Sequence, residues 1–199
     1  MCRPETETAF DTVVTVTLNT ALDRIIETPA LQVGAHLVGR RIARQPAGKG
    51  VNVSRALAAL GVASVATGFV GAEDLAEFER VSDGTVVRTQ FLSVPGHTRE
   101  NITLIDPANG TETHVRTDGA VVGDRDIERL RRKLALLLRP NTLAVFAGSL
   151  PPGIDVGQFV SLVDDALAAG AAVAVDCAPE ALAAVADRPL WLVKCNREE

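Results

Sequence analysis

The chain has 199 residues, a length typical of one domain or of one domain with a small appendage. Hydrophobic residues make up 47% and charged residues 23%, which indicates a globular protein with a buried core and excludes a disordered chain. The net charge of -5 gives no general attraction for nucleic acid or for an anionic membrane, so we expect neither as a partner.

Targeting segments, membrane helices and metal motifs are not evident in the sequence. Residues 1–10 lack a basic stretch followed by an apolar run, and no segment approaches the run of about 18 apolar residues that a membrane helix needs. We therefore expect a cytoplasmic protein. The cysteines, Cys2, Cys177 and Cys195, form no CxxC pattern, so we expect reduced thiols and no zinc site.

The first part of the chain is predicted to contain a strand, a helix and a second strand. The β-branched run at 13–18 is too short for a helix and predicts a buried strand, with Asn19 and Asp23 just past its end. Residues 52–60 predict a helix, and residues 64–67 predict the next strand.

In the middle of the chain the hydrophobic pattern changes to strict alternation. Polar and apolar residues alternate through 89–94, 101–106 and 111–117, and this pattern predicts antiparallel strands with one buried face. We assign residues at about 24–45 and 86–118 to a small β appendage beside the core.

Helices and strands alternate again in the last part of the chain, beginning with a helix. Their predicted bounds are 124–138, 143–147, 156–169, 171–176, 180–185 and 190–194. Such alternation predicts a mostly parallel sheet covered on both faces, an α/β fold of three layers. The last strand is followed by only five residues and no covering helix, so we expect the chain to be incomplete relative to its fold.

In such a sheet ligands bind at the carboxyl ends of the strands. The residues directly after predicted strands are Asn19, Asp23, Gly148, Ser149, Asp176 and Asn196.

Residues 47–54, Ala-Gly-Lys-Gly-Val-Asn-Val-Ser, form the most informative motif. Small residues let the backbone approach a ligand, the following helix offers free N–H groups, and Lys49 and Asn52 can bind anionic or hydroxyl groups. The motif predicts an anion and sugar site, with a plain glycine turn as the alternative. It is not a Walker A loop, because Gly50 follows the lysine, nor a dinucleotide fingerprint, because Val53 replaces a glycine. This argues against an oxidoreductase.

Two further motifs are less specific on their own. Residues 148–153, Gly-Ser-Leu-Pro-Pro-Gly, follow a strand, so Ser149 would face the same cleft; a proline-rich turn is the alternative. Arg99 opens a β segment and could clamp a phosphate through two donors, although a solvated surface arginine is the alternative. The basic residues at 129–139 lack interleaved aromatics and are interpreted as a solvated helix face.

Five motifs, in this order and at this spacing, resemble those of the phosphofructokinase B-type sugar kinases, which have the ribokinase-like fold. They are found at residues 19–23, 47–54, 98–102, 148–153 and 194–199. Within this family, the residues of the five motifs are most similar to those of 1-phosphofructokinase and tagatose-6-phosphate kinase. The resemblance implies one kinase domain over 12–199, a three-layer α/β/α core with a small antiparallel β lid, and pairing of two lids into a homodimer.

The resemblance also implies a role for each matching residue. Sugar and substrate phosphate would be bound by Asp23, Gly48, Lys49, Asn52, Arg99 and Ser149. Lys194 and Asn196 match the nucleotide-phosphate side of the site, and Asn196 with Glu199 matches the Asn-x-x-Glu motif that organises Mg²⁺. The implied activity is ATP-dependent phosphorylation of a ketohexose phosphate, converting fructose 1-phosphate to fructose 1,6-bisphosphate.

One departure from the family pattern bears on activity. The Gly-Ala-Gly-Asp motif, whose Asp is the catalytic base, does not occur in the 199 residues and is expected beyond them. Because general-base catalysis contributes about 10² to 10⁴-fold, we expect impaired or absent turnover from this chain alone. The alternative function is a non-catalytic remnant that binds a sugar phosphate or dimerises. Residues 116–123 also depart from the sequence pattern of the family.

Overall fold

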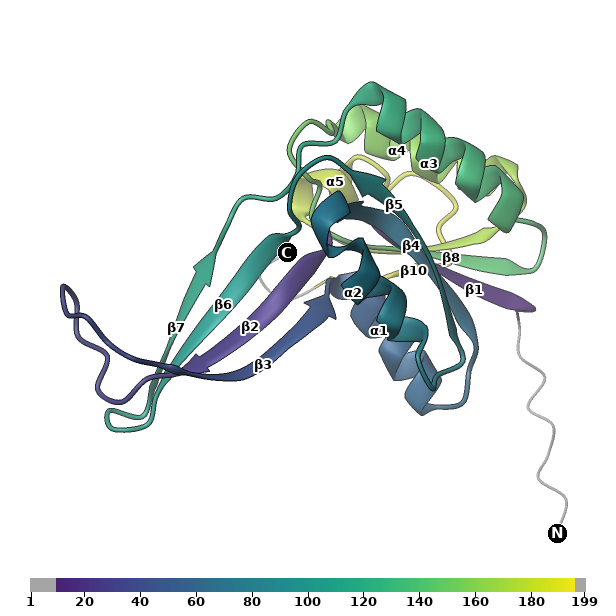
Figure 1. Cartoon of the computed structure of the whole chain (residues 1–199). Helices are drawn as coiled ribbons and strands as arrows, with labels where there is room; N and C mark the ends of the chain where they lie inside the picture. The colour runs from purple at the N-terminus through teal and green to yellow at the C-terminus, as the bar shows by residue number, and fades with distance from the viewer. Residues whose placement is uncertain (1–9, 196–199) are drawn as a thin grey trace, which may run out of the picture.

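The computed structural model describes residues 10–195, which form two β-sheets and the helices packed around the larger sheet (Figure 1). Every neighbouring pair in the larger, six-stranded sheet is parallel. In spatial order its strands are β10 (Leu192–Val193), β9 (Ala172–Cys177), β8 (Thr142–Gly148), β1 (Thr12–Thr17), β4 (Ser64–Gly71) and β5 (Val87–Val94).

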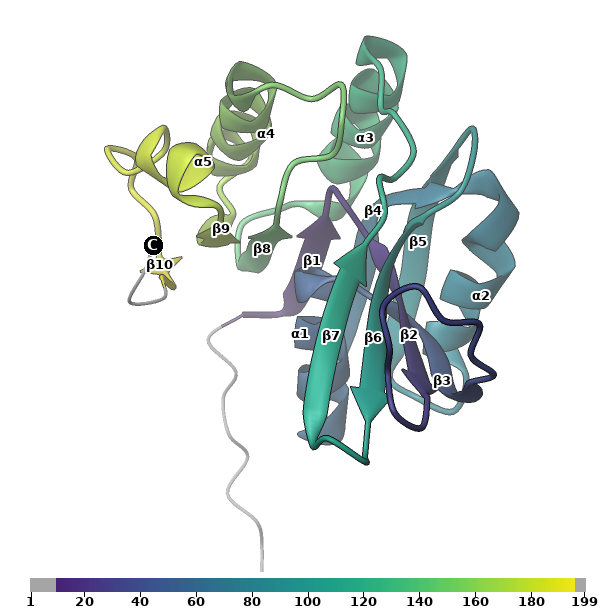
Figure 2. The same ribbon diagram turned by 90° about the vertical axis from the view of Figure 1, so that its left-hand side faces the viewer.

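Helices cover both faces of this sheet (Figure 1, Figure 2). One face carries α1 (Lys49–Ala59) and α2 (Leu75–Glu79), with the short 3-10 helices η1 (Ala72–Asp74) and η2 (Arg80–Ser82) flanking α2. The other face carries α3 (Asp124–Leu137), α4 (Val156–Ala168) and α5 (Pro179–Ala183). The predicted three-layer α/β/α core with a parallel sheet is therefore confirmed. Within residues 10–195, no helix is long and apolar enough to cross a membrane.

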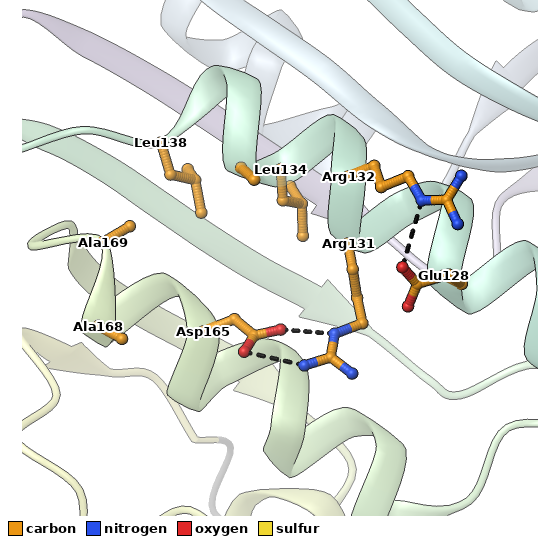
Figure 3. Close-up of a pocket in the computed structure, with 9 residues that line it drawn as sticks. Glu128, Arg131, Arg132, Leu134, Leu138, Asp165, Ala168 and Ala169 are labelled. Atoms are coloured by element: carbon orange, nitrogen blue, oxygen red, sulfur yellow. Dashed lines mark hydrogen bonds and ion pairs between the residues drawn. The ribbon is translucent and has the colours of Figure 1, made fainter.

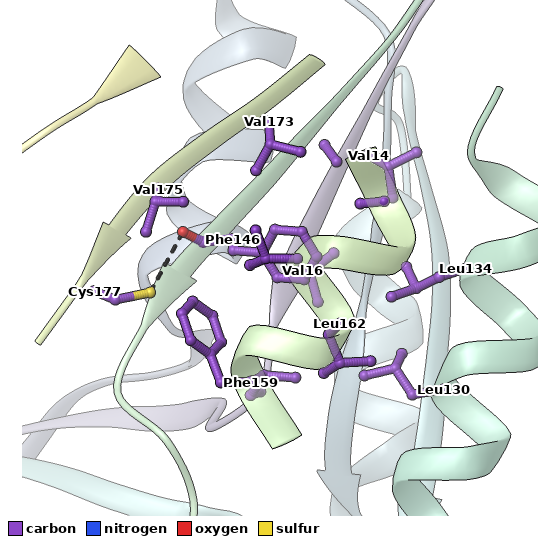
Figure 4. Packing of buried hydrophobic residues seen from close by; sticks show 14 of the residues in the cluster. Val14, Val16, Leu130, Leu134, Phe146, Phe159, Leu162, Val173, Val175 and Cys177 are labelled. Atoms are coloured by element: carbon purple, nitrogen blue, oxygen red, sulfur yellow. Dashed lines mark hydrogen bonds between the residues drawn. The ribbon is translucent and has the colours of Figure 1, made fainter. Parts of the chain in front are cut away.

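The larger hydrophobic core lies between the sheet and helices α3 and α4 (Figure 4). Helix α3 presents Ile127, Leu130 and Leu134 to it, since residues three or four apart share one face of a helix. Phe146 of β8 meets Phe159 of α4 edge to face, with ring centroids 6.0 Å apart. This packing fixes β8 against α4, and the loop that joins them contributes to the candidate site.

The smaller sheet forms a lid that projects from the core (Figure 1). Its spatial order is β3 (Arg40–Ala47), β2 (Ala21–Glu27), β6 (Arg99–Asp106) and β7 (Thr111–Arg116). The outer pairs are antiparallel, whereas β2 and β6 run parallel with Ala21 opposite Arg99. The predicted antiparallel β appendage is thus present, although its two central strands are parallel.

The prediction that residues 89–94 belong to the lid is wrong. They lie within β5, which pairs with β4 in parallel over its whole length and forms the edge of the core sheet. Phe91 packs into a cluster on one face of this strand and Leu92 into the core on the other. The polar residues on either side of them, Thr89, Gln90 and Ser93, are only partly buried at this edge, so an edge strand of the core shows the same alternation as a lid strand.

Helix α4 begins at a capping box that the structure shows in full. The Asp155 Oδ1 atom accepts a hydrogen bond from the Gln158 N–H at 2.7 Å, and the Asp155 N–H donates to Gln158 Oε1 at 2.9 Å. We expect Asp155→Ala to lower the free energy of unfolding by about 1 kcal/mol, measured by urea denaturation. Asp155→Ser keeps an acceptor oxygen and serves as the control. Equal stability of the alanine variant and the unaltered chain would contradict a capping role.

Candidate active site

The six residues predicted to bind the sugar and its phosphate line one cavity of about 340 Å³. They are Asp23 of β2, Gly48, Lys49 and Asn52 at the start of α1, Arg99 of β6, and Ser149 after β8. The cavity lies where the carboxyl end of β8 and the start of α1 meet the lid. Residues from four separate elements therefore converge at the sheet edge where an α/β fold binds its ligands.

The glycine motif lets helix α1 start directly against the end of β1. Gly48 has φ of 127°, and a Cβ atom there would lie 2.8 Å from Thr17 Cγ2; at Gly50 it would lie 2.4 Å from Thr17 Oγ1. Neither position has room for a side chain. The helix start has no side-chain cap and no acidic residue in its first turn, so its N–H groups remain suited to an anion.

Asn101 of the lid, which the sequence analysis did not single out, holds two of the predicted residues in place. Its Nδ2 atom donates to Asp23 Oδ1 at 2.8 Å, and its Oδ1 atom accepts from Arg99 Nη1 at 3.3 Å. Arg99 Nη2 also donates to the backbone oxygen of Asn19 at 3.3 Å. The carboxylate and the guanidinium are thereby fixed side by side at the cavity wall. Asn101 lies two residues after Arg99 on the same strand, so the alternation of the strand places both side chains on one face.

Arg116, at the end of β7, is the second binding candidate that sequence reasoning missed. It lines the same cavity as Arg99, and burial together with the neighbouring Arg116 charge lowers the pKa of Arg99, while Asp23 acts in the opposite direction. Two guanidinium groups near one carboxylate leave excess positive charge, which suits a dianion such as a phosphate monoester. Arg116 lies opposite Asn101 in the register of β7 with β6, and the sequence alone does not reveal this register.

The loops after β1 and β8 are joined at the cavity wall. Asn19 Nδ2 donates to Ser149 Oγ at 3.1 Å and to the Leu150 backbone oxygen at 3.2 Å. Asn19 was predicted at the carboxyl end of a strand, and the structure shows that it connects this end to the Ser149 loop. A wider hollow of about 680 Å³ adjoins the cavity and shares Arg99, Arg116 and Ser149 with it.

Asp176, at the end of β9, forms ion pairs with two lysines. Lys49 Nζ lies 2.8 Å from Asp176 Oδ1, and Lys194 Nζ lies 3.5 Å from Asp176 Oδ2. The residue predicted on the sugar side and the one predicted on the nucleotide side therefore share one carboxylate. This contact joins the two halves of the predicted site.

The predicted metal and nucleotide residues Asn196 and Glu199 lie outside the described residues, so their roles stay predictions. Within residues 10–195, no three His, Cys, Asp or Glu side chains gather in a way that could hold a metal ion. Asp176, which pairs with Lys194, also pairs with Lys49, so its charge is already neutralised by two ammonium groups. The described part of the chain therefore does not form a Mg²⁺ site by itself.

A separate groove of about 560 Å³ lies between α3 and α4 and is not a candidate for the chemistry (Figure 3). Arg131 of α3 donates to both carboxylate oxygens of Asp165 on α4, at 2.7 and 3.1 Å, and Arg132 pairs with Glu128. The groove contains none of the residues predicted to bind a ligand. The Arg131–Asp165 pair holds the two helices together, whereas Arg132 and Glu128 pair within α3.

Cys177 lies beneath this edge of the sheet and is 2% exposed. Burial, and secondarily the Asp176 charge, raise the pKa of its thiol to about 12. We expect iodoacetamide at about pH 8 to leave Cys177 unmodified in the folded chain while the exposed Cys195 reacts, as mapped by peptide mass spectrometry. Labelling of both at equal rates would contradict this.

The same thiol gives the sign of a pH dependence. The folded pKa of Cys177 lies above its ordinary value of 9.0, so the folded chain binds the proton more tightly than the unfolded chain. Its contribution to stability is therefore complete below about pH 9 and is lost as the pH rises toward 12.

Known proteins match almost the whole of this chain, whereas the chain spans only part of their length. The model of the pfkB family carbohydrate kinases matches residues 13–199. The 1-phosphofructokinase of Vibrio cholerae is 33% identical over 187 residues, covering 94% of this chain and 59% of that protein. The 1-phosphofructokinase of Rhodobacter capsulatus is 34% identical over 191 residues, covering 94% and 60%.

Solved structures agree with these relatives. Phosphofructokinase-2 from Escherichia coli in complex with fructose-6-phosphate superimposes with a TM-score of 0.85 and 27% identity, covering 94% of this chain and 62% of that one. The chain thus spans about three fifths of the length of the relatives it matches. Because the model of this family extends over residues 13–199, the chain belongs to the pfkB family of carbohydrate kinases.

Proposed function

We propose that this chain provides the sugar-phosphate site of an ATP-dependent carbohydrate kinase that converts fructose 1-phosphate to fructose 1,6-bisphosphate. The observation that carries the proposal is the cavity in which Arg99 and Arg116 lie beside Asp23. A ketohexose phosphate offers a dianion to the two guanidinium groups and hydroxyl groups to the carboxylate. Relatives at 33% and 34% identity are named 1-phosphofructokinase, which supports this substrate over other sugar phosphates.

The side chains that line the cavity are proposed to bind different groups of the sugar phosphate. Arg99 and Arg116 clamp the phosphate, while Asp23 accepts a hydrogen bond from a sugar hydroxyl group and Asn101 keeps it oriented. Lys49, Asn52 and Ser149 also line the cavity, and the acceptor hydroxyl group of the sugar is proposed to lie beside them. Such a site acts by fixing the substrate in one orientation, which is a large part of catalysis in phosphoryl transfer.

ATP and Mg²⁺ are the proposed cofactors. When bound, ATP supplies the transferred phosphoryl group and Mg²⁺ neutralises charge on it. Lys194, Asn196 and Glu199 are the residues proposed to hold them, and the described part of the chain contributes the first of these. Asp176 sets the position of Lys194 through their ion pair and places it on the side of the sheet that carries Lys49.

We assign the catalytic base to none of the three aspartates near this edge of the sheet. Asp124 accepts a hydrogen bond from Gln158, Asp155 caps α4, and Asp176 pairs with two lysines. We therefore expect the chain alone to bind the sugar phosphate with little or no turnover. Kinase activity that disappears on mutation of one of these aspartates would overturn that assignment.

The test is calorimetric titration of the purified chain with fructose 1-phosphate, alongside a coupled assay for its phosphorylation by ATP. Binding without turnover is the expected result. Turnover would show that the chain contains its own catalytic base, and it would still support fructose 1-phosphate as the substrate. Fructose 6-phosphate is the matched competitor, and tighter binding of it would overturn the choice of substrate. We propose a cytoplasmic location, because the proposed reaction uses ATP and a phosphorylated sugar.

A non-catalytic remnant that pairs with a second copy through the lid is the alternative function. The lid exposes Ile42 on β3 and Val115 on β7, each a little under half accessible. A contact that covers them would form a homodimer. Sedimentation of the chain and of an Ile42→Glu variant tests this, and a monomer in both cases would exclude pairing through that strand.

A further inference from the structure

We propose that Asp74, which lies outside the ligand cavity, is a positioning residue that fixes the base of the lid and thereby aims Arg99 at the substrate phosphate. The inference rests on the proposed function, because it assigns Arg99 to the phosphate. It is carried by one juxtaposition: the buried carboxylate of Asp74 accepts from the N–H of Thr98, directly before Arg99, and also binds Arg44 of the lid strand β3.

The use of the Asp74 side chain is unusual for its place in the chain. Asp74 occupies the N-cap position of α2, where an aspartate commonly accepts from the helix N–H groups, yet no side-chain capping bond is present. Its carboxylate turns to the lid instead: Oδ2 accepts from the Thr98 N–H at 2.8 Å, and Oδ1 accepts from Arg44 Nη2 at 3.2 Å. Only 8% of the residue is exposed. A buried carboxylate with two charge-assisted or backbone donors is a rigid anchor.

The end of β4 provides the other half of this anchor. The Gly71 N–H donates to Thr98 Oγ1 at 3.0 Å, so Thr98 is held through both its backbone and its side chain. A Cβ atom at Gly71 would lie 2.3 Å from the Thr98 nitrogen and from the His97 carbonyl carbon, so the lid backbone rests directly on this glycine. Thr20, the residue before β2, donates to the Phe69 backbone oxygen at 2.6 Å.

Both central lid strands are therefore fastened to one short platform at the end of β4. Ala21 and Arg99 are opposite each other in the register of β2 and β6, directly after the two fastened threonines. Arg44 adds a link from β3 to Asp74 and to Glu77 of α2. The backbone position of Thr98 sets the direction in which the side chain of Arg99 extends from the platform. Asp74 is the only charged group in the described structure that accepts a hydrogen bond from the Thr98 N–H.

The test compares Asp74→Asn with Glu77→Gln. The amide introduced by Asp74→Asn keeps the shape of the side chain but has a single acceptor oxygen, so it cannot hold both Thr98 and Arg44. The Glu77 change removes a partner of Arg44 without touching Thr98. We expect amide hydrogen exchange of peptides covering 96–101 to rise at least about tenfold in the first variant and to change little in the second. Unchanged exchange in Asp74→Asn would overturn the inference.

A double-mutant cycle with Arg99→Ala separates positioning from a general loss of structure. Calorimetric titration should show that Asp74→Asn weakens fructose 1-phosphate binding about tenfold in the unaltered chain and has no further effect when Arg99 is already alanine. An equal loss in both backgrounds would overturn the inference, because it would show that Asp74 does not act through Arg99.

These experiments distinguish a failure of the proposed function from a failure of the inference about Asp74. If the unaltered chain binds no fructose 1-phosphate, the substrate proposal fails, and the exchange comparison still decides whether Asp74 fixes Thr98. If Asp74→Asn does not fold, Asp74→Glu tests the same contact, because it keeps the negative charge for Arg44 and moves the carboxylate out of position for the Thr98 N–H. Faster exchange at 96–101 is again the supporting result, and unchanged exchange the contrary one.

Discussion

Replacement of Arg99 by alanine is expected to weaken binding of fructose 1-phosphate by about 100-fold, the largest effect of any single side chain in the cavity. The guanidinium is partly desolvated, and it already has fixed directions because it donates to Asn101 and to the Asn19 backbone oxygen. A group held in this way loses little conformational entropy when a phosphate arrives. Its removal leaves Arg116 alone beside the dianion.

The controls for this prediction distinguish charge from geometry. Arg99→Lys keeps the charge and loses the paired donors, and we expect an intermediate loss of about tenfold. Arg88→Ala removes an exposed arginine from β5, outside the cavity, and should leave the affinity unchanged. Calorimetric titration measures all three. If Arg99→Ala and Arg88→Ala bind the sugar phosphate equally well, the assignment of Arg99 to the phosphate is wrong.

The features that the sequence could predict are those set by neighbouring residues. The strand at β1, helix α1 and the glycine motif follow from runs and turns a few residues long, and the structure contains each of them. Convergence of the strand ends could be predicted as well, because a parallel sheet brings its carboxyl ends to one edge. That rule is enough to place Asn19, Ser149 and Asp176 at the same edge of the sheet.

The features that the sequence could not predict depend on pairing between distant segments. β5 alternates like a lid strand, and only its parallel register with β4 shows that it belongs to the core. Arg116 enters the cavity because β7 pairs with β6, and Lys49 meets Asp176 from 127 positions away. Such contacts are fixed by the whole fold and leave no local pattern in the residues that make them.

Substitution of Gly68 by alanine is expected to be the most destabilising single change near the site, lowering the free energy of unfolding by about 2 to 6 kcal/mol. Gly68 of β4 pairs with Thr17, the last residue of β1, and has φ of 134°, a conformation that residues with a side chain rarely adopt. A Cβ atom there would lie 1.9 Å from the Thr17 backbone oxygen. The two strands must separate where β1 leads into Asn19 and the cavity, so fructose 1-phosphate binding should weaken as well.

Gly61→Ala is the matched control, because it isolates the backbone cost from the collision. Gly61 also has a positive φ, 77°, but nothing lies within 4 Å of an added Cβ atom, so we expect a loss of only about 1 kcal/mol. Urea denaturation followed by circular dichroism gives both values. Equal losses in the two variants would show that the close approach of β4 to Thr17 is not what requires glycine at position 68. A larger loss for Gly68→Ala, accompanied by weaker sugar-phosphate binding, would show that the contact between β1 and β4 holds the cavity in its binding geometry.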